Sequence, residues 1–432
     1  MIFAQTNNSR RETRFFESFE EREAAFNADV GRLIPGRYRG AHYFWRDFSR
    51  LTEGLDAARA RVPAHITSNP RDCLAFGTAE QVLAAASMSA GTRVTGPDRP
   101  LEKITVQFGL EKVGRQPIRS LSGGETVRLA LAKAMLAAPG TEKLVIASPF
   151  CWLSQHHLPL LETVEAKYAD LGKPVRILAM AGEDSLAPLE AGWLTPADQS
   201  PQPFDLALER LHIQLGTPVN ALTAKPALAG VADFHQTLAS PCLVTGDNGQ
   251  GKSVLAKALC GAAVARGLAR VGSPGRSGRP RLLFQDVVTQ TLLRSPAQMA
   301  AEFGGMNGRD AGEICGAVLE DVSNRLTQNG RMPETQAPGE PTLLVVKAML
   351  IAVRLAALPS ALILDEPDWG FARDKAIAFV LSVVRHCHER GVPVMLISHK
   401  PWWGPMAGSV LSVGKTAPRS ERDLFGIRVE RV

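Results

Sequence analysis

Residues 242–253 read Cys-Leu-Val-Thr-Gly-Asp-Asn-Gly-Gln-Gly-Lys-Ser, and this stretch decides the fold. A short β-prone run leads into the glycine-rich segment, and an apolar helical pattern follows Ser253. Strand, G-x-x-x-x-G-K-S loop and helix in this order predict a phosphate-binding loop. Glycines let backbone N–H groups turn toward phosphate oxygens, and the helix N-terminus adds partial positive charge.

Within this loop we expect every residue to contact the phosphates of one nucleotide. The eight positions are Gly246, Asp247, Asn248, Gly249, Gln250, Gly251, Lys252 and Ser253. The Lys252 ammonium should reach the β- and γ-phosphates, and the Ser253 hydroxyl should bind Mg²⁺. The pattern therefore predicts ATP and Mg²⁺ as ligands.

Polar residues follow three other apolar runs that read as buried strands. The run 361–364 ends in Asp365-Glu366, so that Asp365 would bind Mg²⁺ and Glu366 would act as general base toward the attacking water. Gln285 follows the run 281–284, where its amide would join the metal and water shell. His399 follows 394–398, where its imidazole would contact the transferring phosphoryl oxygen.

The first half of the chain has no such loop but carries Leu121-Ser122-Gly123-Gly124-Glu125. Ser122 and Glu125 form a capping box, whose usual meaning is only that a helix begins. Two glycines between them are costly in a helix, but they let an anion approach the backbone N–H groups. We therefore expect one nucleotide held between two related domains, with 122–125 supplying contacts to the γ-phosphate.

These motifs together resemble those of the ATP-binding cassette (ABC) ATPases, over about residues 100–182 and 206–413. The resemblance identifies 246–253 as Walker A, 121–125 as the signature, 365–367 as Walker B, Gln285 as the Q-loop and His399 as the switch histidine. It implies an α/β fold with two P-loop NTPase-type domains packed head to tail and mostly parallel sheets. In that family each nucleotide lies between one cassette's Walker A and the other's signature.

The departures from the family pattern are unequal between the halves. The first half has no Walker A, and its Walker B place, 145–149, has Ala147 and Ser148 where the acids belong, with Gly182 at the switch position. The second half has 335–339 in place of a signature. One composite site thus keeps its parts. The stacking aromatic for adenine has no clear equivalent around 215–224, and Ala372 replaces the D-loop Asp, which implies slow turnover.

Both halves end in the same order of helix, buried strand, helix and buried strand, which suggests an internal duplication. Each helix contains Lys-Ala-Met-Leu, at 133–136 and 347–350; the strands are expected at 143–147 and 175–180, and at 361–365 and 392–397. The proline-rich stretch 184–204 reads as a linker. We therefore predict domains 1–204 and 205–432.

Composition favours a globular protein of the cytoplasm. Of the 432 residues, 45% are hydrophobic and 21% charged, and the six cysteines show no paired spacing of a disulfide or zinc framework. No run reaches the roughly 20 apolar residues that cross a bilayer, and the N-terminus does not resemble a signal peptide. We expect no membrane span in the chain itself.

The sequence does not identify the molecule on which the predicted ATPase acts. The leading hypothesis is an ATPase that drives conformational change in a macromolecular complex; the alternatives are the ATP-hydrolysing subunit of a transporter with a separate membrane subunit, and an ATP-binding scaffold with little turnover. Arg266, Arg270, Arg276, Arg279 and Arg281 would suit nucleic acid or an acidic protein, although a solvated loop explains them better. Packing explains the Arg- and aromatic-rich segment 10–50 better than nucleic-acid stacking does.

Overall fold

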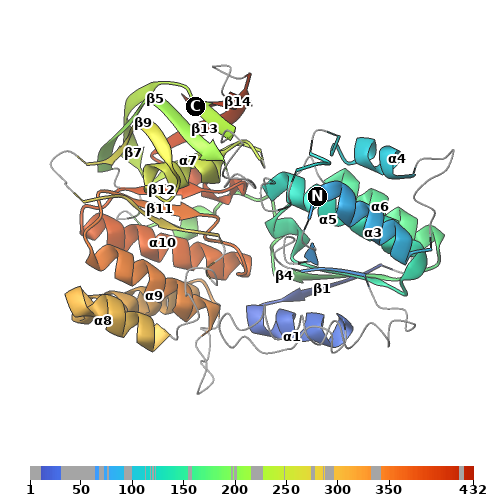
Figure 1. Cartoon of the computed structure of the whole chain (residues 1–432). Helices are drawn as coiled ribbons and strands as arrows, with labels where there is room; N and C mark the ends of the chain where they lie inside the picture. The colour runs from blue at the N-terminus through green and yellow to red at the C-terminus, as the bar shows by residue number, and fades with distance from the viewer. Residues whose placement is uncertain are drawn as a thin grey trace. The chain divides into compact units, whose positions relative to one another are not determined.

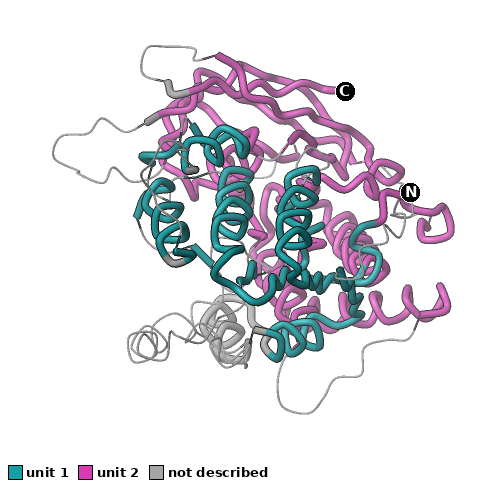
Figure 2. The backbone as a smooth tube through the Cα atoms, turned by 90° about the vertical axis from the view of Figure 1, so that its right-hand side faces the viewer, with its two compact units in different colours: residues 1–184, 370–372 teal, residues 185–369, 373–432 magenta. Residues whose placement is uncertain are grey.

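The computed structural model describes most of the chain in two compact units (Figure 2). The described residues are 11–30, 64–67, 73–74, 77–91, 100–111, 113–116, 118, 121, 123–153, 158–195, 198, 202–215, 227–247, 249–273, 278–285, 287, 296–331, 342–417 and 423–432. Unit 1 comprises 1–184 with the short stretch 370–372, and unit 2 comprises 185–369 and 373–432.

Unit 1 is a parallel sheet with helices on both faces. Its elements are β1 (Arg11–Phe16), α1 (Phe19–Val30), β2 (Ala64–Ile66), α3 (Ala79–Ser89), α4 (Pro100–Gln107), α5 (Gly123–Ala137), β3 (Leu144–Ala147), α6 (Leu158–Asp170) and β4 (Val175–Met180). The described strands follow the order β1-β4-β3-β2, and every pair is parallel. Helix α1 covers one face, and α3, α5 and α6 lie on the other (Figure 1).

Unit 2 combines a parallel half-sheet with an antiparallel layer. Its elements are β5 (Gln202–Leu215), β6 (Ala227–Val231), β7 (Phe234–Ser240), β8 (Cys242–Thr245), α7 (Lys252–Leu259), β9 (Ala265–Gly272), β10 (Arg281–Leu283), α8 (Pro296–Gln328), α9 (Leu343–Ala356), β11 (Leu362–Asp365), α10 (Arg373–Glu389), β12 (Val394–Ile397), β13 (Ser409–Thr416) and β14 (Asp423–Arg431). The order is β10-β11-β12-β8-β13-β14-β6-β5-β7, with β9 beside β5.

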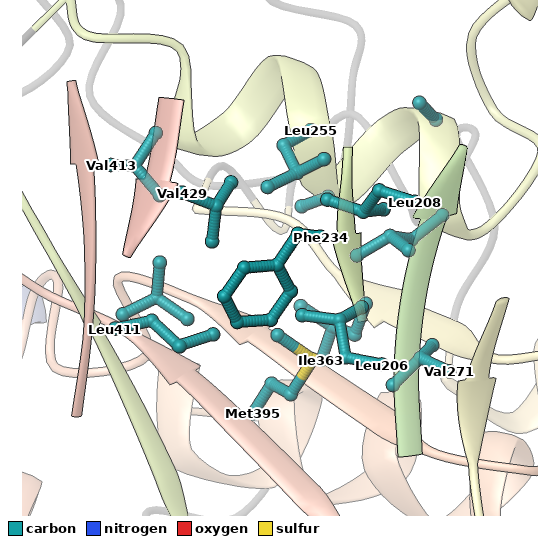
Figure 3. Close-up of a cluster of buried hydrophobic side chains, with 14 of the residues drawn as sticks. Leu206, Leu208, Phe234, Leu255, Val271, Ile363, Met395, Leu411, Val413 and Val429 are labelled. Carbon is teal, nitrogen blue, oxygen red and sulfur yellow. The ribbon is translucent and has the colours of Figure 1, made fainter. Parts of the chain in front are cut away.

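The core of unit 2 lies around the helix that follows the glycine-rich loop. Phe234 lies among side chains of the antiparallel strands, and Leu255 of α7 and Met395 of β12 line the same cluster (Figure 3). Because α7 is apolar on the side that meets these residues, burial holds its first turn in place. The loop thus joins two elements that are both anchored in the core.

The two units repeat one arrangement, as the sequence predicts. The order β1-β4-β3-β2 in unit 1 corresponds to β8-β12-β11-β10 in unit 2, so that α1 corresponds to α7, α5 to α9 and α6 to α10. The strands expected at 143–147, 175–180, 361–365 and 392–397 appear as β3, β4, β11 and β12. The α/β architecture with mostly parallel pairing is confirmed.

The proline-rich stretch after residue 184 packs on unit 2. Asp198 is fully buried and accepts two hydrogen bonds from the Arg325 guanidinium of α8, at 2.8 and 3.0 Å. Leu189 N donates to the Trp402 carbonyl, and Trp402 Nε1 donates to the Ser185 carbonyl. The division of the structure therefore falls after Asp184 and not near residue 205, because this buried ion pair ties the stretch to α8.

Two other sequence interpretations meet the structure in part. Arg266 and Arg270 are exposed, but they lie on strand β9, paired with β5, and not in a loop; Arg276 is outside the described residues. Within 10–50, residues 11–30 form β1 and α1, where Phe19 and Phe26 are buried, as packing predicts. Residues 31–50 are outside the described part of the chain.

Candidate functional site

Strand register brings the predicted catalytic residues of unit 2 to one edge of its sheet. Leu283 pairs with Leu364, Asp365 pairs with Ile397, and Ile397 pairs with Val244. Gln285, Asp365 and Glu366, His399 and the glycine-rich loop all follow these positions by one or two residues. Parallel strands therefore place them at neighbouring carboxyl ends, where open α/β sheets bind ligands.

The loop after β8 requires glycine at two positions. Gly246 has φ 133°, and a Cβ there would collide with the Val413 carbonyl oxygen of β13. Gly251 has φ 103°, and a Cβ would lie 2.9 Å from Ile427 Cδ1 of β14. Only glycine combines these backbone angles with such close neighbours, so the loop is held against β13 and β14.

Lys252 opens helix α7 and is turned back over the loop. Its side chain is 7% exposed, and Nζ donates to the carbonyls of Gly246 at 2.6 Å and Asp247 at 3.1 Å. The next residue, Ser253, is hydrogen-bonded through its side chain to Asp365 of β11. The loop and the strand that ends in acids are therefore in direct contact. Asn248 is outside the described residues.

The buried acids Asp365 and Glu366 and the largely buried His399, whose side chain is 10% exposed, form what we call the acidic corner. His399 Nδ1 lies 3.1 Å from Glu366 Oε1. Asp365 Oδ1, Glu366 Oε2 and His399 Nε2 are buried and have no hydrogen-bond partner among the described residues. Buried polar atoms without partners are rare in proteins, so these atoms fit a polar ligand such as Mg²⁺ and a nucleotide phosphate.

Burial and neighbouring charges act in opposite directions on the acids. Burial, with a contribution from Glu366, raises the pKa of Asp365 to about 6, against the Ser253 hydrogen bond and the Lys257 and Lys252 charges. Burial also pushes the pKa of Glu366 upward, but His399, Lys252 and Lys400 outweigh it and hold that pKa below its usual value. The corner therefore keeps Glu366 ionised and able to accept a proton.

The remaining predicted residues are only partly placed. Gln285 is half-buried beyond β10 and makes no hydrogen bond with another described residue. Helix α5 begins at Gly123, and Gly124 and Glu125 lie in its first turn, while Ser122 is outside the described residues. Residues 216–226 and 335–339, which bear on adenine stacking and on the missing signature, are also outside them.

Comparison with known proteins identifies the relatives of this chain. No family model matches it. An uncharacterized ABC transporter ATP-binding protein of Mycobacterium tuberculosis, found in two strains, is 27% identical over 363 residues, which is 75% of this chain and 50% of the relative. The chain is homologous to the ABC ATPases. It spans about half the length of the curated relatives that it matches.

Among solved structures, the RNase-L Inhibitor aligns with 12% identity and a TM-score of 0.46, over 94% of this chain and 80% of that one. An archaeal ribosome recycling factor, solved in complex with a ribosomal stalk protein, aligns with 13% identity and a TM-score of 0.47, over 96% and 80%. In the described part of this ABC ATPase homologue, no helix is long and apolar enough to cross a membrane.

The ABC homologue has a second, altered corner in unit 1, formed by Ala147, Ser148 and Met180. Ala147 pairs with Leu178 as Asp365 pairs with Ile397, so Met180 holds the place of His399. The sequence interpretation placed that position at Gly182; the strand register moves it by two residues. Ser148 has φ 45° and Glu366 has φ 48°, so the backbone is alike although the acids are gone.

Protein groups fill the space around this unit 1 corner. The fully buried Arg22 of α1 donates to the Ser148 hydroxyl. The buried Glu183 carboxylate accepts from Cys151 N at 2.8 Å and from Met180 N at 2.7 Å. The β1–α1 connection has only two residues, Glu17 and Ser18, where unit 2 has its six-residue glycine-rich loop. No phosphate-binding loop is built there.

Sequence reasoning missed several residues around the acidic corner. Val413 and Ile427 flank the loop from β13 and β14, and the Gln250 side chain accepts from Lys415 N at 2.5 Å. Asp368 is buried, and burial, together with the charge of Glu366, raises its pKa. A third acid close after Asp365-Glu366 could have drawn notice in the sequence, whereas the β13 and β14 contacts leave no local pattern.

Proposed function

We propose that this protein is a Mg²⁺-dependent ATPase that binds and hydrolyses one ATP at the acidic corner of unit 2. The observation that carries the proposal is the set of buried, unpartnered atoms Asp365 Oδ1, Glu366 Oε2 and His399 Nε2, beside the glycine-rich loop over which Lys252 is turned back. Homology to the ABC ATPases supports the same reaction. When bound, Mg²⁺ would neutralise charge on the β- and γ-phosphates.

The roles follow from the positions of these side chains. Lys252 would exchange its two carbonyl acceptors for phosphate oxygens, and Ser253 with Asp365 would hold Mg²⁺, with Gln285 joining that shell. Glu366, kept ionised by His399, would accept the proton of the attacking water. The Nε2 atom of His399 would face the transferring phosphoryl oxygen.

A second part of the proposal concerns how the site is completed. Ser122, Gly123, Gly124 and Glu125 would contact the γ-phosphate through the N-terminus of α5, which begins at Gly123. The two cassettes would then pack head to tail, within one chain or between two chains. Nucleotide would favour the closed state only through its additional contacts there.

ATP turnover of matched variants tests the proposed reaction. Glu366→Gln keeps shape but removes the proton acceptor, so we expect kcat to fall by about 100-fold or more while Mg²⁺-ATP binding is retained. Ser148→Ala, at the corresponding position of unit 1, should leave kcat unchanged. If Glu366→Gln leaves turnover unaltered, the remaining hypothesis is that the protein is an ATP-binding scaffold with little turnover of its own.

A separate variant tests whether residues 122–125 complete the site when the two cassettes close on the nucleotide. Ser122→Arg places a large cation at the helix start, so we expect it to weaken nucleotide-dependent compaction more than initial nucleotide binding. Small-angle scattering with and without Mg²⁺-ATP, using Glu366→Gln to retain the nucleotide, measures compaction. If Ser122→Arg compacts as its parent does, the signature does not complete the site.

We further propose that ATP-driven closure acts on a macromolecular partner. Nucleic acid or an acidic protein would suit the exposed Arg266 and Arg270 of β9. The alternative is the ATP-hydrolysing subunit of a transporter, favoured by the name of the curated relative. A native pull-down with Glu366→Gln separates the two: enrichment of an integral membrane protein that stimulates turnover supports the transporter, and a membrane-free complex supports the first proposal.

A further inference from the structure

A fully buried lysine holds the loop that follows the acidic corner. Lys347 of α9 is 0% exposed, and its Nζ donates to the Pro367 carbonyl at 2.7 Å and to the Trp369 carbonyl at 2.5 Å. The ammonium also lies 5.8 Å from the centroid of the Trp369 ring.

A buried lysine of this kind is costly, because its charge must leave water. The cost is offset only where the ammonium donors find good acceptors, and here two acceptors are the backbone carbonyls on either side of Asp368. The hydrophobic pattern of α9 would be satisfied equally well by methionine or leucine. The lysine is therefore explained by what it does to the 367–369 backbone.

That backbone sets the direction of Glu366. Glu366 has φ 48°, a left-handed conformation that costs a non-glycine residue free energy and needs support from its surroundings. The turn is closed by Trp369 N, which donates to the Glu366 carbonyl at 3.1 Å. Lys347 binds the carbonyl of the residue after Glu366 and the carbonyl of the residue that closes this turn.

We propose that Lys347 is a positioning residue for Glu366. By fixing the 366–369 turn, it keeps the Glu366 carboxylate beside His399, where proton transfer requires it. Small displacements of a catalytic group cost on the order of 100-fold in rate, so a device that fixes this turn bears on kcat and not on nucleotide affinity. The catalytic part of this inference rests on the proposed ATPase activity.

Unit 1 offers a natural contrast. Lys133 lies in the same Lys-Ala-Met-Leu segment of the corresponding helix α5, but it is only partly buried and donates to the Cys73 carbonyl. The turn after β3 is held instead through its N–H groups, since Cys151 N donates to Glu183. Only the helix of unit 2 directs its lysine to the turn that carries a glutamate.

The test compares Lys347→Met with Lys133→Met in the full chain, by hydrogen exchange of backbone amides and by ATP turnover. Lys347→Met should speed exchange of the Glu366, Asp368 and Trp369 amides by about tenfold or more without changing exchange in α10 and β12. It should lower kcat about 10- to 100-fold with KM and ATP-binding stoichiometry unchanged. Lys133→Met should change neither.

Lys347→Gln keeps N–H donors without the charge. We therefore expect its amide exchange and its kcat to lie between those of Lys347→Met and the wild type. The same variant replaces Lys347→Met in the test if Lys347→Met fails to fold. Unchanged exchange of the Glu366, Asp368 and Trp369 amides in both Lys347 variants overturns the inference whatever the activity. A kcat loss that comes with an equal loss of ATP-binding stoichiometry also overturns it. A third outcome separates the two proposals. If amide exchange in the turn is faster in the Lys347 variants but the wild-type protein shows no turnover that depends on Glu366, then Lys347 does hold the turn and the proposed ATPase activity is wrong.

Discussion

The turn after β11 in unit 2 and the turn after β3 in unit 1 share a backbone and differ in what surrounds it. Glu366 and Ser148 have nearly the same left-handed φ, and both donate their N–H to the neighbouring parallel strand. In unit 2 Asp365, Glu366 and His399 each keep a buried polar atom without a hydrogen-bond partner among the described residues, whereas in unit 1 the side chains of Arg22 and Glu183 bind the turn, with only Arg22 Nε of these two unpartnered. The first arrangement suits a ligand; the second suits stability.

The comparison shows that the same left-handed turn occurs with and without acidic residues. A residue other than glycine adopts the left-handed conformation only where the surrounding structure stabilises it. In unit 1 the Glu183 carboxylate supplies that support, and the Met180 side chain is fully buried where unit 2 has His399. The left-handed conformation alone therefore does not distinguish a ligand site from a structural turn.

The largest expected effect comes from the glycine-rich loop. Gly246→Ala forces a Cβ into the Val413 carbonyl at φ 133°, so we expect nucleotide affinity to fall on the order of 100-fold, equivalent to about 3 kcal/mol. Phe16→Ala, at the corresponding position of β1, should leave affinity unchanged. Titration calorimetry with Mg²⁺-ATP measures both, and equal losses would erase the contrast between the units.

Glu183 should matter for the stability of unit 1, whereas we expect Glu366 to matter for turnover. Glu183→Gln replaces one acceptor oxygen by an N–H group that faces a backbone N–H, so we expect a loss of about 3 kcal/mol in the free energy of unfolding. Nucleotide affinity of the folded protein should stay the same. Denaturant unfolding followed for unit 1 decides this, and a neutral Glu183→Gln would show that the carboxylate is not a support.

A smaller effect concerns acid stability of unit 2. Burial lowers the pKa of His388 below its ordinary value of 6.5, and the ring is bound to Ser240 Oγ at 2.9 Å. The unfolded state then binds the proton more readily, so stability is present above pH 6.5 and is lost as the pH falls through the lowered pKa. His388→Gln should flatten this dependence in unfolding experiments between pH 7.5 and 5.5.

The smallest expected effect is the most informative about the unit 1 corner. The double change Ala147→Asp and Ser148→Glu restores the acids, but the connection between β1 and α1 still has two residues and Met180 still replaces histidine. We therefore expect steady-state ATP turnover to stay within about twofold of wild type. A second, Glu366-independent turnover in this variant would show that acids alone complete a site.

Local patterns predicted much of the acidic corner. A glycine-rich loop and an acid pair after an apolar run report backbone conformation and strand ends, which depend on neighbours in sequence. The switch position in unit 1 was misplaced because the run 175–180 was aligned by its apolar residues, whereas the Ala147–Leu178 pair sets the register. The contact of Lys347 with the turn after Glu366 was not predicted, because a lysine within a helix gives no sign in the sequence that it is buried.

The amino-acid sequence by itself determined the strand, loop and helix around Lys252, the acids at 365 and 366, and the repeated order of elements, since each depends on residue type and short spacing. Tertiary structure alone decided that Val413 and Ile427 close on the loop, that Arg22 meets Ser148, and that Lys347 holds the turn after Glu366. Those contacts join residues distant in sequence, and only the register and packing of whole elements bring them within bonding distance.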